Sequence, residues 1–511
     1  MSENEIFKGA DAWKQALPQP ICEDAPEYDF LYQRAWELAH DHVRHIEGMP
    51  QTPYMDEAFC DTQIWIWDTC FMTLFCKYAP KEFPGVESLR NFYDVLYGDK
   101  RLASVIVTDR EPEWIGATVG EPREIQIHLA DNPPLFAFAE YENALFHGDL
   151  DHLRDLLCNR RVLQKHYDWL NSLSEPYYPR GVHARTRMAK EKLGYRWEGG
   201  RSGMDNTPRG KTEERTEKSR PNNPDMLWID AICQQALSAR LIAKMLGLLG
   251  ETEEQREWER RYEEQKELVN RYYWDDEDGF YYDTSLDGSR RYKVKTTASY
   301  WALVADIASD ERARRMLDAV LDENELGGEV PLISLSRSDG NYEHNGKYWR
   351  GALWLPTAYS TLRGLTRYGF HEEAHGFGRK IVDHMLKTYQ SYEPHTIWEC
   401  YSPEKPEPSV SDADERVRPD FCGWSALGPI SVYIENVIGF HSVDAFKRLV
   451  RWHKPKEFQK TLGIRNLRFG DVVTDVVAVG NVCRVKSNAP YTLEINGTAY
   501  SIEAGEQEIA L

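Results

Sequence analysis

Residues 227–271 read LWIDAICQQALSARLIAKMLGLLGETEEQREWERRYEEQKELVNR. In the first half, large apolar side chains from Leu237 to Leu248 recur at steps of four, four and three residues, which is the spacing of one buried face of a helix. Gly250 ends that helix as a C-cap would, and residues 253–271 are charged except for a narrow apolar seam. The stretch predicts an apolar helix packed beside a charged one.

The same alternation continues along most of the chain. We expect further helix pairs at Phe30–His45 with Trp65–Tyr78, Leu135–Phe146 with Leu150–Leu170, Thr297–Ala308 with Asp310–Leu321, and Leu353–Tyr368 with Glu372–Tyr389, and a last helix that begins near Trp424. Half of these helices are more apolar than their partners, which indicates an inner and an outer layer. We predict an all-α (α/α)6 toroid over residues 1–455. An open solenoid is the competing fold, but the chain lacks the fixed period that marks such repeats.

The pattern changes past residue 455. Valines crowd residues 472–479, and apolar residues then alternate on both sides of Asn496-Gly497, from Tyr491 to Ile502. Alternation around Asn-Gly is a strong signal for a β-hairpin. We therefore predict a small β appendage over residues 456–511 and expect it to have a structural role.

The composition is that of a folded protein with an acidic surface. The 511 residues are 41 % hydrophobic and carry 62 Lys and Arg against 83 Asp and Glu, a formal net charge of −21. The apolar share excludes a disordered chain. Because an acidic surface repels the phosphates of nucleic acids and of anionic lipids, we expect neither nucleic acid nor a membrane as a partner.

Targeting and redox features point to the cytoplasm. No stretch approaches the roughly 20 apolar residues of a membrane span, and Met1–Glu5 lacks the basic start of a signal peptide. The nine cysteines include no Cys-x-x-Cys pair, which excludes a zinc ribbon. Cys60, Cys70 and Cys76 lie among apolar neighbours, as reduced core cysteines do.

Aromatic residues make up 12 % of the chain and include 16 Trp. Aromatic rings fill cores, and they also stack on the apolar faces of sugar rings. Three segments combine aromatic with polar side chains: IWIWDT at 64–69, WEGGRSGMDNTPRG at 197–210 and PHTIWECYSP at 394–403. In the first, Trp67 could stack on a sugar, and Asp68 could either cap a helix or accept hydrogen bonds from sugar hydroxyls.

The second and third segments each offer a carboxylate. Glycines before Asp205 let the backbone approach a ligand closely, and a plain turn would not need Trp197, Arg201 and Arg209 beside it. Glu399 lies between aromatic residues, as an ion-pair partner or a catalytic base would. Asp205 and Glu399 are 194 residues apart (399 − 205), so only a fold that returns the chain can join them. Two facing carboxylates are what glycoside hydrolysis requires.

Five short motifs appear in an order that resembles glycoside hydrolase family 63 and, less closely, the trehalases of family 37. They are Trp67-Asp68, Ser202-Gly203-Met204-Asp205-Asn206, Tyr348-Trp349-Arg350-Gly351-Ala352-Leu353-Trp354, Trp398-Glu399-Cys400-Tyr401-Ser402-Pro403 and Gly423-Trp424-Ser425. The resemblance covers most of residues 60–440. It implies an (α/α)6 barrel and an inverting, exo-acting α-glycosidase, usually an α-glucosidase, with Asp205 as general acid and Glu399 as general base.

The resemblance also implies a substrate-binding set. Trp67, Asp68, Arg350, Gly351 and Trp354 fall on positions that hold the sugar. This chain departs from the family at Asn132, where Gln is usual, and at Arg201, where Glu is common; neither departure alters the fold expected. The full substrate-binding set that we expect is Trp67, Asp68, Asn132, Trp197, Arg201, Asn206, Arg350, Gly351, Trp354, Trp398 and Trp424.

General chemistry agrees with these roles. Burial in an aromatic pocket, together with repulsion from nearby carboxylates, would raise the pKa of Asp205 so that it holds a proton, while Glu399 would polarise a water. Inversion predicts carboxyl groups about 6.5–9.5 Å apart, and retention predicts about 5–5.5 Å. Arg350 could instead form an ion pair with one of the acids.

Alternative functions remain at this level. A sugar epimerase or isomerase on the same toroid would use histidines such as His183, His344 and His395; a trehalase and a non-catalytic sugar-binding protein are further options. No histidine has metal-ligand spacing, and no cofactor is indicated. The long loops Asp109–Asp131 and Glu175–Pro224, the second with a charged run at 211–220, suggest a mobile lid. The sequence leaves the sugar, the linkage and the oligomeric state open.

Overall fold

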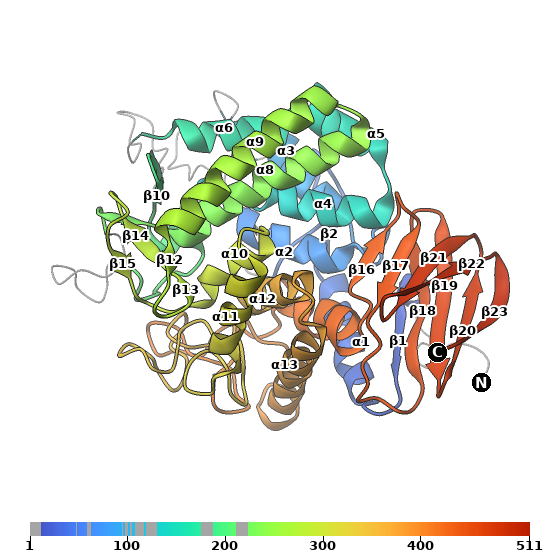
Figure 1. Cartoon of the computed structure of the whole chain (residues 1–511). Coiled ribbons are helices and arrows are strands. Elements are labelled where there is room, and N and C mark those ends of the chain that lie inside the picture. The colour runs from blue at the N-terminus through green and yellow to red at the C-terminus, as the bar shows by residue number, and fades with distance from the viewer. Residues whose placement is uncertain are drawn as a thin grey trace.

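The computed structural model describes residues 12–47, 49–58, 63–94, 96–97, 101–102, 105–107, 117–118, 130–174, 188–210 and 223–511. Cys60, His183, the charged run at 211–220 and most of the loop 109–131 lie outside these residues, and so does the lid hypothesis that rests on them. The described chain is rich in helices, with a β region toward its C-terminal end (Figure 1).

Six helical segments follow one another in contact. They are α2 (Ile66–Cys76), α4 (Phe136–His147), α8 (Ile229–Leu249), α10 (Trp301–Val304), α12 (Leu355–Arg367), and η4 (Ser425–Leu427) with η5 (Gly428–Val437). Each contacts the next, and η4 and η5 contact α2 again, so the order of contacts returns to its start. Every side chain of α2 and η5 is buried, as an inner layer requires.

Amphipathic helices alternate with these along the chain. They are α1 (Tyr28–His40), α3 (Gly85–Asp94), α5 (Leu150–Arg154) with η2 (Asp155–Asn159) and α6 (Val162–Ser172), α9 (Thr252–Tyr272), α11 (Asp310–Leu321) and α13 (His371–Ser391). The pair α8 and α9 runs side by side in Figure 1, and α9 buries only one narrow face. The predicted pairing of an apolar helix with a charged one is therefore confirmed in this pair.

Some helices differ from the expected ranges. α1 ends at His40 rather than at residue 45, because strand β2 (Val43–Arg44) follows and pairs with β3 (Tyr54–Met55). The helix expected over 150–170 breaks before α6, where Arg161 has a left-handed φ of 55°. The segment at 297–308 forms only a short 3-10 turn, η3 (Thr297–Tyr300), and α10. Helix α3 was not predicted.

The β region has two sheets. The first has the order β1 (Gln19–Cys22), β18 (Leu462–Phe469), β19 (Val472–Val479), β20 (Val482–Ser487), β23 (Gly505–Ala510), and the second β16 (Ser442–Asp444), β17 (Leu449–Trp452), β21 (Tyr491–Ile495), β22 (Thr498–Ile502). The expected hairpin is present: Ile495 pairs with Thr498 around Asn496 and Gly497, both left-handed. The β region begins at Ser442, before the expected boundary at 456, and it takes in β1 from the other end of the chain, which Figure 1 shows in blue beside β18.

Short elements line the loops between helices. They are η1 (Ala12–Ala16), β4 (Gln63–Trp65), β5 (Leu96–Tyr97), β6 (Arg101–Leu102), β7 (Val105–Val107), β8 (Ala117–Thr118), β9 (Ala189–Glu191), β10 (Gly194–Arg196), α7 (Gly199–Ser202), β11 (Met226–Leu227), β12 (Trp274–Asp275), β13 (Phe280–Tyr281), β14 (Asp283–Ser285) and β15 (Arg291–Tyr292). No helix in the described part of the chain is long and apolar enough to cross a membrane.

Predicted site residues lie where inner helices begin. Trp67 and Asp68 stand in the first turn of α2, Trp354 directly precedes α12, and Trp424 directly precedes η4. Asn132 lies four residues before the first residue of α4. Two of these helix starts are in direct contact, since the rings of Trp354 and Trp424 lie 5.6 Å apart between centroids.

Candidate active site

Glu399 lies at the centre of the candidate site, on the loop after α13. Its side chain is 3 % exposed. The Tyr348 hydroxyl donates to Oε1 at 2.9 Å, and the backbone N–H of Arg418 donates to Oε2 at 3.2 Å. The indole N–H of Trp424 donates to the Glu399 carbonyl at 2.8 Å. Three separate segments therefore fix both ends of this residue.

The electrostatics of Glu399 connect it to Asp205. Burial raises the pKa of Glu399 above its usual value, and hydrogen bonds from Arg418 and Tyr348 oppose that shift. The charge of Asp205 raises this pKa further. The fold thus brings these two carboxylates within electrostatic range of each other, although 194 residues (399 − 205) separate them.

Asp68 is a third carboxylate in the same field. Its pKa lies well above the usual value, first because of burial and then because Glu399 and Asp205 repel a further negative charge, while Arg418 acts in the opposite direction. Asp68 stands within α2 rather than at its N-cap, which is Trp65, so the capping interpretation does not hold. The three acids and Arg418 form one electrostatic group.

Glu57 is a buried acid that the sequence interpretation missed. It is fully buried, and one of its oxygens accepts the backbone N–H of Trp65, which begins the segment that carries Asp68. Burial raises the pKa of Glu57 well above its usual value, and the negative charge of Asp68 raises it further. The Glu57 carbonyl also accepts the N–H of Gly423 at 3.0 Å, beside Trp424. Glu57 therefore links two of the segments that surround Glu399.

The Asp205 loop is fixed by close packing. Gly203 is left-handed (φ 84°), and a Cβ there would lie 3.1 Å from the indole of Trp67, so the backbone lies against that ring. Asp205 follows and is half-buried, whereas we expected an enclosed side chain. The amide of Asn206 donates to the Lys347 carbonyl at 2.9 Å and accepts the N–H of Trp349 at 2.8 Å. Asn206 thereby joins the loop to the segment that carries Tyr348.

Trp197, Arg201 and Asn132 form a buried support beside that loop. The Trp197 indole donates to the Asp131 carbonyl at 2.8 Å. The Arg201 guanidinium lies 3.3 Å from the Asp131 carboxylate and donates to the Asn132 amide oxygen at 3.3 Å. All four residues are at least nine-tenths buried. These contacts position the segment that precedes α4.

Tryptophans pack behind Tyr348. Trp354 stacks on Trp349 with ring centroids 4.1 Å apart, donates to the Tyr348 carbonyl at 2.9 Å, and contacts Trp424 at 5.6 Å between centroids. Trp354 is only 1 % exposed, so it belongs to the core that supports Tyr348. Trp398 is also buried, and its indole N–H has no hydrogen-bond partner among the described residues.

Arg350 and Gly351 lie on the same segment. Among the described residues, the ion pair that Arg350 makes is with Glu343, at 4.0 Å, so the alternative pairing with an acid of the site is not the one observed. Its Nε is buried and makes no hydrogen bond within the described chain. Gly351 has φ 136°, and a Cβ there would approach the Tyr342 ring to 2.6 Å. Only glycine fits this position.

The histidines that would serve an epimerase contact groups other than these acids, as far as they are described. His344 is largely exposed and pairs with Glu404 at 2.6 Å. His395 contacts the Tyr389 carbonyl and Glu393. Tyr348, Arg418 and Glu57 are the participants that sequence reasoning missed; Tyr348 stood within a quoted motif, but Arg418 and Glu57 had no signal.

Comparisons with known proteins agree with the geometry. Residues 63–413 match the family model described as the mannosylglycerate hydrolase MGH1-like glycoside hydrolase domain. Among curated relatives, a mannosylglycerate hydrolase of Rubrobacter radiotolerans is 29 % identical over 161 residues (31 % of this chain, 35 % of that protein). A cytosolic neutral trehalase of Kluyveromyces lactis is 30 % identical over 138 residues (27 % and 18 %). The chain thus spans well under half of these two relatives.

Solved structures share the fold. The GH63 mannosylglycerate hydrolase of Thermus thermophilus in complex with glucose matches with a TM-score of 0.56 at 18 % identity, covering 78 % of this chain and 99 % of that one. A structure titled sialidase matches with a TM-score of 0.67 at 12 % identity, covering 93 % of this chain and 40 % of that one.

Proposed function

This chain belongs to the mannosylglycerate hydrolase MGH1-like glycoside hydrolase family, and from that premise we propose that it is an inverting, exo-acting α-glycosidase with Asp205 as general acid and Glu399 as general base. The observation that carries the proposal is the electrostatic contact between these two carboxylates from distant segments, with Tyr348 hydrogen-bonded to Glu399.

We propose that the helical body is an (α/α)6 toroid. The support is the order of contacts, in which six inner segments lead back to the first while amphipathic helices alternate with them along the chain. A closed ring has the helix starts at one end, which is where Asp68 and Trp354 stand. The loops at that end would then form the working face.

The two acids differ in ways that suit their roles. Glu399 accepts hydrogen bonds from Tyr348 and from the Arg418 N–H, and both favour the ionised form that a general base needs to polarise water. The charge of Asp205 raises the pKa of both Asp68 and Glu399, so the three acids share one field, and we propose that Asp205 is the acid that donates a proton to the leaving oxygen. In the balanced reaction, water forms a bond to the anomeric carbon and gives a proton to Glu399, while the bond from that carbon to the leaving oxygen breaks and the aglycone leaves with the proton of Asp205.

We propose that Trp67, Asp68, Arg350 and Trp398 contact the sugar. The indole N–H of Trp398 and the Nε–H of Arg350 are donors that no other described residue uses, and Asp68 offers an acceptor. Asn132, Trp197, Arg201, Asn206, Gly351, Trp354 and Trp424 act chiefly by positioning, because their polar groups or packing are engaged by protein.

The substrate proposed is a small α-glucoside or oligosaccharide. The names of the relatives add two specific candidates, trehalose and mannosylglycerate. The cytosolic trehalases among those relatives also support a cytoplasmic location.

The test is a proton NMR assay of the purified chain with a panel of α- and β-linked disaccharides, trehalose and α-mannosylglycerate. We expect the β-anomer to appear first from an α-linked substrate, and Asp205→Asn and Glu399→Gln each to lose about 10³-fold or more in kcat. Glu415→Gln, an exposed acid on the loop beyond Glu399, is the matched control and should keep full activity. An α-anomer appearing first, or activity in both variants, would contradict the assignment.

A further inference from the structure

A pocket of about 340 Å³ lies at the C-terminal end of α4 between α3 and α5. None of the acids described above lines it: its lining on α4 runs from Glu140 to His147, the last residue of a helix that spans about 18 Å at 1.5 Å per residue. Nothing in the proposed function uses this pocket.

The lining of this pocket is acidic. Five carboxylates line it, those of Glu87, Glu140, Asp149, Asp151 and Asp155, against two basic groups, Arg90 and His152. His152 is committed to Glu140, with Nε2 and Oε2 2.7 Å apart, and that carboxylate raises the pKa of His152. The remaining acids outnumber Arg90, so the pocket attracts positive charge.

Two buried acceptors in the lining lack partners. Asn143 is 2 % exposed; its Nδ2 donates to the Ala139 carbonyl at 2.8 Å, but its Oδ1 has no hydrogen-bond partner in the described structure. The Nε2 of His147 is likewise buried and unpartnered among described residues. Since a buried polar atom without a partner costs roughly 1–3 kcal/mol, each calls for a donor.

His147 presents a lone pair. Burial lowers its pKa to about 4, so the ring is neutral, and a hydrogen bond to the Lys77 backbone opposes the shift, as donation to a carbonyl does. The other nitrogen, Nε2, is then the acceptor. The C-terminus of α4 adds its partial negative charge at the same place.

The spacing of the acids argues against a single metal ion. Within the described residues, the only three acidic or histidine groups whose ligand atoms lie close enough for one ion are Asp275, Glu277 and Asp278, which are distant in sequence, and Lys293 already lies 3.1 Å from Asp275. A ligand of this pocket must instead carry its positive charge and its N–H donors across several ångströms.

We propose that this pocket binds a small organic amine with two ammonium groups, one held by the unpartnered acceptors Asn143 and His147 and the other by the outer carboxylates Glu87 and Asp151. Each ammonium group brings three N–H donors, enough for Asn143 and His147, which lie four residues apart on α4, and for Glu87 on α3 with Asp151 on α5. The volume is within the range of small-molecule sites.

The probe is 1,4-diaminobutane, titrated into the full chain by calorimetry at low salt. We expect one site, and the double variant Glu87→Gln/Asp151→Asn should weaken binding about tenfold or more, because two charge-assisted bonds are lost. The matched control is Glu253→Gln/Glu311→Gln, two acids in the first turns of α9 and α11, which should bind as the parent does. Melting curves of both variants without ligand verify that the fold is kept.

Three results would overturn the proposal. They are the absence of heat with 1,4-diaminobutane, equal affinity in the Glu87/Asp151 double variant, and equal binding of Mg²⁺ or Ca²⁺ in competition with the amine, which would reveal an unspecific acidic surface. A second variant, His147→Leu, removes an acceptor without changing charge and should also weaken binding. Glycosidase activity is not part of the readout, so the outcome is independent of the proposed function.

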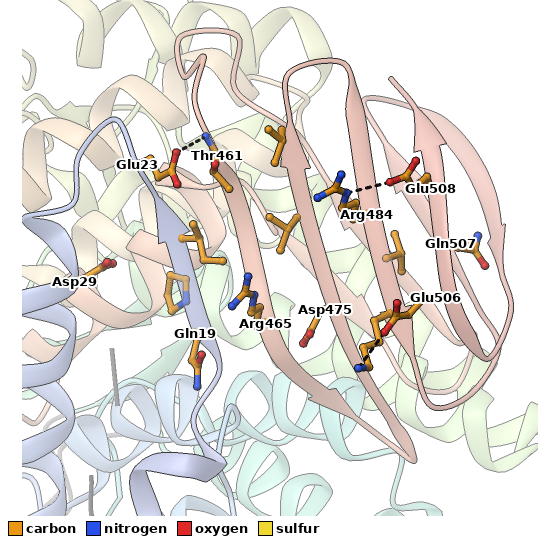
Figure 2. Close-up of a pocket in the computed structure, with 16 residues that line it drawn as sticks. Gln19, Glu23, Asp29, Thr461, Arg465, Asp475, Arg484, Glu506, Gln507 and Glu508 are labelled. Atoms are coloured by element: carbon orange, nitrogen blue, oxygen red, sulfur yellow. Dashed lines mark hydrogen bonds and ion pairs between the residues drawn. The ribbon is translucent and has the colours of Figure 1, made fainter. Parts of the chain in front are cut away.

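A different pocket, lined by β1, β18, β19, β20 and β23, lies on one face of the first sheet (Figure 2). Four of its eight charged side chains pair with one another, Arg484 with Glu508 at 3.0 Å and Lys486 with Glu506 at 3.1 Å. Among the described residues of this lining, the buried polar atom without a partner is a donor, Gln19 Nε2, whereas the pocket at the end of α4 has unpartnered acceptors.

Discussion

The charge state of Glu399 is set by single hydrogen bonds. The Tyr348 hydroxyl favours the ionised carboxylate, so Tyr348→Phe should raise the pKa of Glu399. A hydrogen bond of about 0.5–1.5 kcal/mol corresponds to about half to one pKa unit. Because a general base must be ionised, activity falls as pH drops through this pKa. We expect the acid limb of the kcat/KM profile to move to higher pH by about that amount.

The control for this change is Tyr368→Phe. That hydroxyl donates to the Ala308 carbonyl at 2.8 Å at the other end of α12, so its loss should leave the pH profile in place. An unshifted profile in Tyr348→Phe, with kcat lowered alike at every pH, would show that Tyr348 serves only packing.

A substitution at Gly351 tests whether the backbone conformation of the segment that carries Tyr348 requires glycine. Its φ of 136° is closed to side chains, and an added Cβ would lie 2.6 Å from the Tyr342 ring. Gly351→Ala should lower the free energy of unfolding by about 1–3 kcal/mol in urea titration and reduce activity.

The comparison is Gly376→Ala in α13, where the new Cβ would meet no described heavy atom within 4 Å beyond its chain neighbours and the backbone of its own helix. Alanine suits a helix interior better than glycine, so this variant should gain up to about 1 kcal/mol. Equal stability of the two variants would mean that the Gly351 loop relaxes without cost.

At the scale of elements, the sequence predicted what local spacing controls. The helices around Leu237 and the hairpin at Asn496-Gly497 follow from periodicity and from a dipeptide that favours one turn, and both are present. The break at Arg161 did not follow, because the residues on either side still have helical spacing. Glu57 was also beyond reach, since its burial depends on segments near residues 65 and 423.

The residues of the quoted motifs were also predictable only in part. Asp68 and Glu399 could be identified from the sequence because acids among tryptophans are unusual. The sequence could not separate the residues that contact the sugar from those that hold other residues in position. Trp197 and Asn206 have the residue types of a sugar site, yet their N–H groups bond to backbone carbonyls of neighbouring segments. Which polar groups remain available is a property of the folded chain.

A histidine cluster joins α13 to the β region. The rings of His371 and His441 lie 4.6 Å apart, as do those of His371 and His453. Burial, then the charge of His371, lowers the pKa of His441 to about 3. This folded-state pKa lies below the unfolded value of about 6.5, so the unfolded chain binds more protons as pH falls. The free energy of unfolding that neutral His441 maintains is therefore fully present above pH 6.5 and is lost as pH falls below it.

The pH dependence of stability should therefore depend on His441. Between pH 6.5 and 5, one such histidine lowers the free energy of unfolding by about 2 kcal/mol. We expect unfolding free energies to fall over that range and His441→Gln to show a shallower fall by about that amount. His344→Gln, at an exposed residue, is the control and should keep the parent's slope. Parallel slopes for parent and His441→Gln would place the titration in other groups.

For the whole molecule, the ends of the chain are structurally joined. Strand β1 pairs in antiparallel register with β18, from Gln19 opposite Arg465 to Cys22 opposite Leu462, so residues 440 apart (462 − 22) share one sheet. The helical body lies between them in the sequence. The two regions therefore cannot unfold independently unless β1 detaches.

Deletion of residues 1–24 tests this coupling. Without β1, the edge of β18 loses its hydrogen bonds, and the buried side chain of Cys22 no longer covers the sheet. We expect a lower melting temperature by several degrees and concentration-dependent aggregation in light scattering, because an unpaired edge strand can pair with another chain. Deletion of residues 1–11, which keeps β1, is the control for shortening the chain, and the melting temperature of the longer deletion is compared with it. If the longer deletion melts in a single transition at the same temperature as the full chain, β1 does not couple the β region to the catalytic body, and the argument fails.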